Sequence, residues 1–206
     1  MNKFRGKIIK DHIKESYNYL DHLVLNFSLL NTSVLVNFIL APSFGFLSIP
    51  YMLIGFLSSC VIFCYIHKAL LHEKIGPLTR LQHFHNRVHH DFFCKDNMTV
   101  DNDEQYALVL MPSSIIFLNV FIIYPLSSYL LSMFFWESMV SYMMIGAQIA
   151  FIVYEICHWA AHTKDSSWES ISYFKNMVEH HREHHLNSHI KFGIASKVGD
   201  MIFETD

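Results

Sequence analysis

The stretch FLSIPYMLIGFLSSCVIFCYI, residues 46–66, contains no charged side chain. A helix rises 1.5 Å per residue, so about 20 apolar residues cross the hydrocarbon core of a bilayer. Residues 23–41, 107–131 and 138–157 share this length and composition, with Glu155 as their single charge. Soluble helices of this length normally carry a charged face. We therefore predict an all-α integral membrane protein with four transmembrane helices, the third kinked or ended by Pro112 and Pro125.

The overall composition narrows the possible partners. Hydrophobic residues make up 52% of the chain and the formal net charge is -3, so no basic field indicates a nucleic-acid partner. The four cysteines form no CxxC pair, and their positions do not suggest a disulfide framework. We expect them to behave as small apolar side chains.

The basic residues predict the orientation in the membrane. All 15 Lys and Arg precede the first span, lie between spans two and three, or follow span four. The positive-inside rule makes these segments, and both termini, cytoplasmic. We expect a retained first span because no small-residue cleavage site follows it. The membrane would be the endoplasmic reticulum in a eukaryote or the inner membrane in a bacterium.

The predicted domain organisation is simple. Residues 1–22 form a cytoplasmic N-terminal segment and residues 23–206 form one membrane domain. Within the first segment, IIKDHIKESYNYL (8–20) spaces its apolar residues as a helix lying on the membrane surface would.

The histidines fall into four short groups on the cytoplasmic side of the predicted topology. These groups are HKALLH (67–72), HFHNRVHH (83–90), HWAAH (158–162) and HREHH (181–185). Residues four apart share one helix face, which pairs His85 with His89, His158 with His162, and His181 with its neighbours at i+3 and i+4. The HxxxxH spacing turns about 140° on an ideal helix. We therefore expect His67 and His72 to serve different metals or to lie where a helix ends.

Imidazole is the commonest metal ligand in proteins and suits iron, zinc and copper. Ten histidines exceed the coordination of one ion, whereas two ions with four or five nitrogens each would use them all. The spacing therefore predicts a two-metal histidine site on a cytoplasmic helical cap.

The series HxxxxH, HxxxHH, HxxxH and HxxHH on four spans resembles the fatty acid hydroxylase/sterol desaturase superfamily of membrane di-metal enzymes. The tail KFGIASKVGDMIFET (191–205) is similar to the closing stretch of that family, an Asn-aromatic-Gly run that ends in Trp-Asp and Phe-Gly-Thr. The resemblance covers roughly residues 50 to 205. The second box has one residue more than the commoner HxxHH. In the tail, Lys191 replaces the usual Asn, and Gly199 and Glu204 replace the usual Trp and Gly.

The resemblance implies ten metal ligands: His67, His72, His85, His89, His90, His158, His162, His181, His184 and His185. The histidines outside the boxes, His83, His180 and His189, are interpreted as surface residues, the alternative being that they orient ligands. Glu155 lies one turn before His158. We expect it to accept a proton from a ligand imidazole, the alternative being a carboxylate that reaches back to the interface.

The resemblance also implies the chemistry. The expected activity is that of an O₂-dependent non-haem di-iron hydroxylase acting on a C–H bond of a fatty acyl chain, sphingolipid, sterol or similar lipid. The cofactors would be two iron ions, with zinc as an alternative in the purified protein. Electrons would come from a separate donor of the cytochrome b5/reductase or ferredoxin type. Alternatives are a desaturase or carotenoid hydroxylase of the same superfamily, an inactive member with structural zinc, and a metal transporter or sensor.

Overall fold

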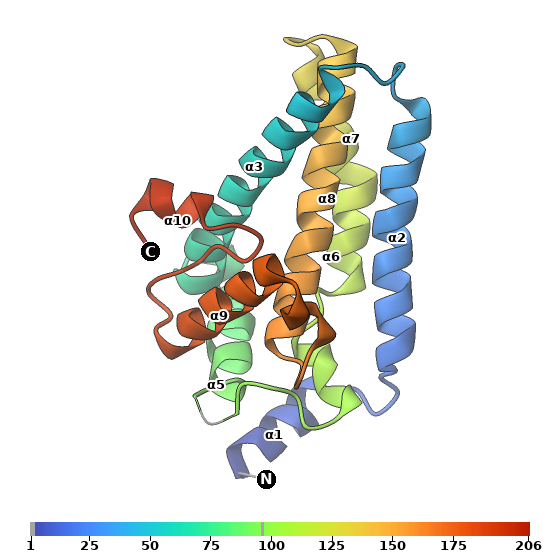
Figure 1. Cartoon of the computed structure of the whole chain (residues 1–206). Helices are drawn as coiled ribbons and strands as arrows, with labels where there is room; N and C mark the ends of the chain where they lie inside the picture. The colour runs from blue at the N-terminus through green and yellow to red at the C-terminus, as the bar shows by residue number, and fades with distance from the viewer. Residues whose placement is uncertain (1–2, 96) are drawn as a thin grey trace. The chain divides into compact units, whose positions relative to one another are not determined.

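The computed structural model describes residues 3–95 and 97–206, and for Lys3 only the backbone. The regular elements within these residues are all helical, so the predicted all-α class is confirmed. The chain, whose helices are labelled in Figure 1, divides into two compact units. We call Leu20–Ser59 with Met111–Glu155 the bundle unit. We call Met1–Tyr19 with Cys60–Leu110 and Ile156–Asp206 the histidine unit.

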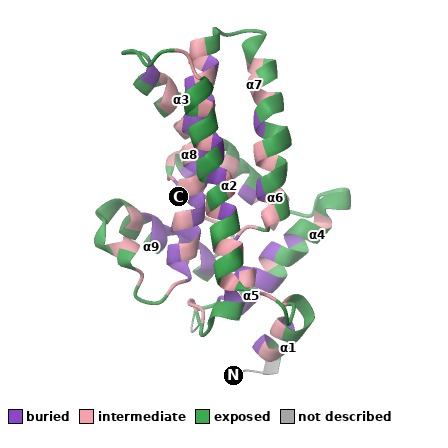
Figure 2. Cartoon of the chain, turned by 90° about the vertical axis from the view of Figure 1, so that its right-hand side faces the viewer, coloured by how far each residue is buried: buried purple, intermediate pink, exposed green. Residues whose placement is uncertain are grey.

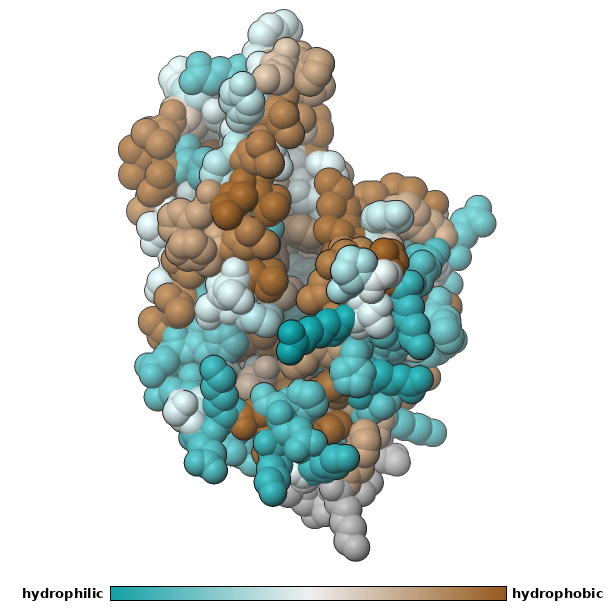
Figure 3. Space-filling view, turned by 180° about the vertical axis from the view of Figure 1, so that it is seen from behind, coloured by the Kyte–Doolittle hydropathy of each residue, from teal (hydrophilic) through white to brown (hydrophobic). Residues whose placement is uncertain are grey.

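In the described part of the chain, four helical segments are long and apolar enough to cross a membrane: Tyr19–Leu40, Ser48–His72, Asp103–Ser132 and Glu137–Ala161. They match the four predicted spans, with ends displaced by a few residues. The chain is therefore a multi-pass membrane protein. Large apolar side chains are exposed on these helices, as Ile39, Leu40 and Ile49 show, and apolar surface covers much of them (Figure 3). Such a surface suits lipid better than water.

The helices that contribute to the bundle unit are, in chain order, α2 (Tyr19–Leu40), α3 (Ser48–Ile66), α6 (Ser113–Leu118), the π-helix η5 (Asn119–Ile123), α7 (Tyr124–Ser132) and α8 (Glu137–Ala161). Within this unit, α3 and α8 approach each other closely at two glycines. A Cβ on Gly55 would lie 1.9 Å from the carbonyl oxygen of Met143, and one on Gly146 would lie 1.9 Å from that of Met52. The bare glycine backbones therefore permit this packing.

The third span is irregular, and its two prolines act differently. Pro112 immediately precedes α6, so the helix starts there as expected for a residue that lacks an N–H. Pro125 lies at the start of α7, and the helix runs on through it directly after the π turn of η5. The helix thus begins after Pro112 and does not end at Pro125, where a kink stays a prediction.

Polar side chains of the bundle unit satisfy the non-helical backbone around Met111. Asn26 Nδ2 donates to the Met111 carbonyl oxygen at 2.7 Å, and His22 Nε2 lies 3.0 Å from the same oxygen. The Met111 N–H donates to Glu155 Oε2 at 3.2 Å. Backbone groups in lipid need such partners because water cannot supply them. Glu155 is 2% exposed, and its Oε2 accepts from this backbone. Its expected role as a proton acceptor for a ligand imidazole stays a prediction.

The histidine unit is built from short elements together with the ends of α3 and α8. The elements are α1 (Lys3–His12), the π-helix η1 (His67–His72), η2 (Gly76–Leu78), α4 (Thr79–Gln82), the π-helix η3 (His83–His89), α5 (His90–Phe92), η4 (Asp103–Leu108), η6 (Ser167–Ser170), α9 (Ser172–Leu186) and α10 (Val198–Phe203). Figure 2 shows buried faces on α5 and α9. These faces carry His90 on α5 and His180, His181, His184 and His185 on α9.

The N-terminal helix differs from the expectation. It ends at His12, so residues 8–20 do not form one helix. Arg5 is buried, and its Nη1 donates to Asn97 Oδ1 at 2.9 Å and lies 3.0 Å from Asp101 Oδ2. Its guanidinium also lies over the ring of Phe92, at 4.2 Å from the centroid. This buried arginine anchors α1 to the rest of the histidine unit. The apolar periodicity of the segment did not reveal this interaction.

The end of α8 and the helix α9 are joined by Arg182. Its Nη1 and Nη2 donate to the two carboxylate oxygens of Glu169 at 3.2 and 3.0 Å, and its Nε donates to the Ala161 carbonyl at 3.1 Å. Beside this pair, Ala160 and Val178 are completely buried. The contact sets the register between the third and fourth histidine boxes, which lie on these two helices.

Candidate metal centre

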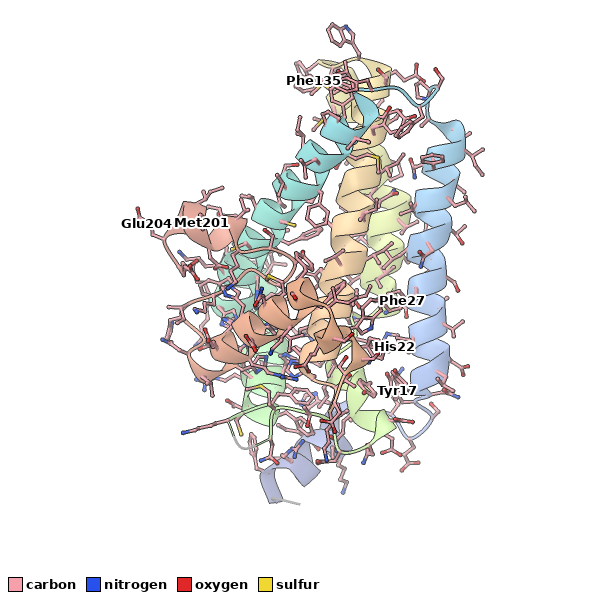
Figure 4. All side chains as sticks on the ribbon, viewed as in Figure 1. Tyr17, His22, Phe27, Phe135, Met201 and Glu204 are labelled. Atoms are coloured by element: carbon pink, nitrogen blue, oxygen red, sulfur yellow. The ribbon has the colours of Figure 1, made fainter. Side chains whose placement is uncertain are left out.

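Histidine nitrogens gather into two groups among the described residues. Figure 4 shows nitrogen atoms concentrated between α9 and α5. The first group consists of His67, His72, His85, His90 and His184, and the second of His89, His158, His162 and His181. Within each group the ligand atoms lie within 4.8 Å of one another. Nine of the ten histidines expected as ligands are thus brought together in sets of five and four.

The first box winds as a π-helix, which explains its spacing. His67 and His72 begin and end η1, and their Nε2 atoms are 3.2 Å apart. A π-helix closes hydrogen bonds from i to i+5, so residues five apart lie near one face. The expectation of two different metals for this pair is therefore wrong. The alternative, that the helix ends here, agrees with the extended conformation of Glu73.

The second box is also π-helical, and this changes its pairing. The N–H of His90 donates to the carbonyl of His85, five residues earlier, and their Nε2 atoms are 3.3 Å apart. His85 and His90 belong to the first group, while His89 belongs to the second. The pairing of His85 with His89 from α-helical spacing is thus wrong. The additional residue in this box coincides with the π segment, since a π turn accommodates one residue more than an α turn.

The fourth box lies on the α-helix α9, and the third box lies on the last turn of α8 and ends with His162, directly after the helix. His158 and His162 share the second group, as their i, i+4 spacing predicts. On α9, His181 and His184 share one buried face, as expected, with ring centroids 5.8 Å apart, but they belong to different groups. His185 Nε2 is 3.1 Å from His89 Nε2 and 3.2 Å from His181 Nε2, which places it beside the second group.

Backbone carbonyls orient the rings. The Nδ1 atoms of five histidines donate to carbonyl oxygens at 2.6 to 2.8 Å: His67 to Phe192, His89 to Leu108, His162 to Met98, His184 to Ile190 and His185 to Phe93. A carbonyl oxygen only accepts, so in each ring the proton is on Nδ1 and Nε2 presents a lone pair.

These tautomers test whether the site fits a metal. His89 and His185 both hold their proton on Nδ1, yet their Nε2 atoms are 3.1 Å apart. Two lone pairs at this distance repel unless a cation lies between them. Burial, followed by the neighbouring imidazoles, lowers the pKa of both rings well below the ordinary value, so protonation is costly. The donor set therefore fits metal ions that prefer neutral imidazole nitrogen.

Comparison with known proteins agrees with this geometry. A model of the family described as fatty acid hydroxylase matches residues 51–205. The chain belongs to the fatty acid hydroxylase family. This family is part of the fatty acid hydroxylase/sterol desaturase superfamily. No curated protein and no solved structure gives a significant match.

The three histidines outside the boxes differ in how far they are buried. His83 and His189 are exposed, as expected. His180 is 1% exposed, and its Nε2 lies 2.9 Å from Asp200 Oδ2, so its interpretation as a surface residue is wrong. Sequence reasoning also missed Asp200, although this residue is the aspartate of the closing Trp-Asp pattern. Its presence in that pattern was the available signal.

The residues that depart from the family tail have structural consequences. Lys191 and Glu204, which stand where the family has Asn and Gly, adopt φ values of 58° and 54°. Asn and Gly are the residues that tolerate this left-handed region best. A Cβ on Gly199 would lie 2.3 Å from Cys64 Cβ. The bulky Trp usual at this position therefore has no room against Cys64.

A cavity of 740 Å³ opens beside the histidines. Its lining includes His90 and His185 from the boxes, together with Arg87, Asp91 and His189. The lining is mostly polar, which suits water and hydrophilic groups rather than an alkyl chain.

Proposed function

We propose that this chain is an O₂-dependent di-iron hydroxylase that acts on a C–H bond of a membrane lipid. Family membership implies an oxidoreductase activity of the lipid hydroxylase type. The observation that carries the proposal is the pair of buried histidine groups, whose Nε2 atoms converge while carbonyls hold the Nδ1 protons.

The proposed ligands are the ten box histidines, with His67, His72, His85, His90 and His184 at one iron and His89, His158, His162, His181 and His185 at the other. Iron bound there would supply the activation of O₂ by two electrons from a separate donor protein. The overall balance is that one oxygen atom enters the C–H bond, while the other leaves as water with two electrons and two protons.

The residues of the chain provide the environment for this reaction. Burial keeps the imidazoles neutral, which leaves their nitrogens available to metal at neutral pH. The polar cavity beside His90 and His185 supports an approach from the aqueous side for protons and for the electron donor. The apolar exterior of the spans supports a substrate that arrives from the bilayer.

The experiment compares lipids of cells that express the wild-type chain, His184→Ala or His158→Ala, together with the metal content of each purified protein. We expect a lipid product heavier by one oxygen, formed only by the wild type, and metal lost from both variants. His189→Ala is the matched control, because this histidine is exposed and outside both groups.

The outcomes separate the alternatives. A product lighter by two hydrogens would indicate a desaturase. Metal binding without a lipid change would favour the inactive member with structural zinc, or a transporter or sensor. A wild-type protein that binds no metal would contradict the proposal.

A further inference from the structure

Asp200, on α10, is a completely buried carboxylate with four close hydrogen-bonding partners. Its Oδ1 accepts from the N–H of Phe192 at 2.7 Å and from Thr205 Oγ1 at 2.8 Å. Its Oδ2 accepts from the N–H of Gly193 at 2.9 Å and lies 2.9 Å from His180 Nε2. A buried carboxylate with this many donors is held firmly and in turn holds the groups that donate to it.

The backbone that Asp200 holds is also the backbone that orients two proposed ligands. Phe192 donates its N–H to Asp200 and accepts from His67 Nδ1 through its carbonyl. Two residues earlier, the carbonyl of Ile190 accepts from His184 Nδ1. Lys191, between them, donates its N–H to the Thr205 carbonyl at 2.6 Å. Asp200 therefore acts on His67 and His184 through one short segment of chain.

The second group has a different support. The carbonyl of Met98 accepts from His162, and the carbonyl of Leu108 accepts from His89. Met98 precedes the third span and Leu108 lies in η4 at its start, and the four side-chain hydrogen bonds of Asp200 given above reach neither residue. The carbonyls that accept from His67 and His184 thus belong to a different part of the chain from those that accept from His162 and His89, while α9 carries both His181 and His184.

Contacts with α3 reinforce this arrangement. Cys64, one helical turn before His67, has its Sγ 3.7 Å from Asp200 Oδ1. Gly199 packs so tightly against Cys64 that a Cβ there would lie 2.6 Å from the sulfur. The helix that carries Asp200 is therefore seated on the turn that leads into the first histidine box.

We infer that Asp200 is a positioning residue for one metal ion only, the ion held by the first group, and that the second group binds metal without it. This inference rests on the proposed two-metal function. It goes further by assigning the closing aspartate to one of the two sites.

The test counts zinc, which binds the same imidazole nitrogens as iron. Each protein is purified in detergent, loaded with Zn²⁺, freed of excess metal and analysed for zinc per chain. We expect one zinc per histidine group in the wild type, and loss of one of these two in Asp200→Ala. Asp11→Ala, which changes an exposed aspartate of α1, is the matched control and should keep both.

Double variants identify the site that remains. Adding His184→Ala to Asp200→Ala should remove no further zinc, because both changes affect the first group. Adding His158→Ala should remove the remaining zinc. The reverse pattern, or an Asp200→Ala protein that keeps both ions or loses both, would overturn the inference.

If Asp200→Ala does not fold, Asp200→Asn tests whether Asp200 affects zinc binding at one site only. An amide keeps one acceptor oxygen but places an NH₂ where Gly193 now donates. We expect zinc affinity at one site to fall about 10- to 100-fold, as is typical when a partner of a metal ligand is changed, with the other site unaltered. Equal weakening of both sites, or of neither, would overturn the inference. A wild type without zinc would instead contradict the proposed function.

Discussion

Two residues of the closing tail occupy a backbone conformation that their side chains disfavour. Lys191 and Glu204 both have positive φ. The left-handed region costs an L-residue with a Cβ about 1 to 2 kcal/mol, whereas glycine adopts it freely. The family has Asn and Gly at these positions. This chain has Lys and Glu instead, which adopt positive φ at a higher conformational energy.

Replacing Glu204 by glycine should therefore stabilise the protein. The relief of about 1 to 2 kcal/mol exceeds the entropic cost of glycine, about 0.5 to 1 kcal/mol. We expect a net increase of up to about 1 kcal/mol in the free energy of unfolding, measured by denaturant titration in detergent. Glu204→Ala is the control and should give no increase, since alanine keeps the Cβ. A less stable Glu204→Gly protein would contradict this explanation.

The buried histidines predict an acid-sensitive metal-free protein. Burial is the largest cause that lowers the pKa of His184 to about 4, and that of His181 well below its ordinary value. Unfolded histidine titrates near 6.5, so below this pH the unfolded chain binds more protons than the folded chain. Stability rises with pH wherever the unfolded state binds more protons.

The free energy of unfolding of the metal-free chain should thus fall as the pH drops from about 6.5 towards 4 and should change little above about 7.5. Each such histidine contributes up to about 1.4 kcal/mol per pH unit. Denaturant titrations at several pH values measure this slope, and His181→Ala should reduce it. A slope that is the same at all pH values would show that these rings are not buried neutral groups.

At the scale of elements, the two π-helices determine which histidines share a group. In η1 and η3, residues five apart come together, as in His67 with His72 and His85 with His90. An α-helical interpretation of the same sequence pairs residues three or four apart instead. A periodicity of 3.6 residues per turn therefore paired the wrong histidines in these boxes, while it was adequate for His158 on α8 and His162 directly after that helix.

Because α3 and α8 approach each other closely in the bundle unit, adding one methyl group at this contact should lower the stability of the protein. Gly55→Ala would place a Cβ against the Met143 backbone, which cannot move away as a flexible side chain can. We expect a loss of about 1 to 3 kcal/mol, typical of overpacking, and a lower melting temperature in detergent. Gly45→Ala is the matched control, because a Cβ there meets nothing within 4 Å. Equal effects of the two substitutions would argue against the tight crossing.

At the scale of the whole molecule, metal should stabilise one unit more than the other. The ten proposed ligands all belong to the histidine unit, and most come from segments far apart in the chain. Binding to a folded site stabilises the structure that forms it. Removal of metal by a chelator should therefore increase hydrogen exchange in residues 60–110 and 156–206.

Exchange in the bundle unit should change little, since residues 20–59 and 111–155 include none of these ligands. Hydrogen–deuterium exchange with mass spectrometry measures both regions in one experiment. Uniform deprotection of the chain, or none at all, would show that metal binding does not act locally.

The four spans and the four histidine boxes were predictable because both depend on residues close together in the sequence. About 20 consecutive apolar residues suit a bilayer whatever surrounds them. His158 and His162 come together because α8 runs regularly through His158 to Ala161, directly before His162. The role of Glu155 was not predictable in this way, since its partner, the backbone of Met111, lies 44 residues away and is exposed by an irregularity in another span.

By itself, the sequence determined an all-helical membrane protein with histidines concentrated in four places. Tertiary structure decided how these histidines are divided, because π winding in η1 and η3 and the contact between α8 and α9 set which rings converge. It also decided that the tail residues Phe192 and Asp200 belong to the centre. Composition and spacing are local properties, whereas a ring held by a carbonyl 125 residues away, as His67 is by Phe192, exists only once the chain has folded.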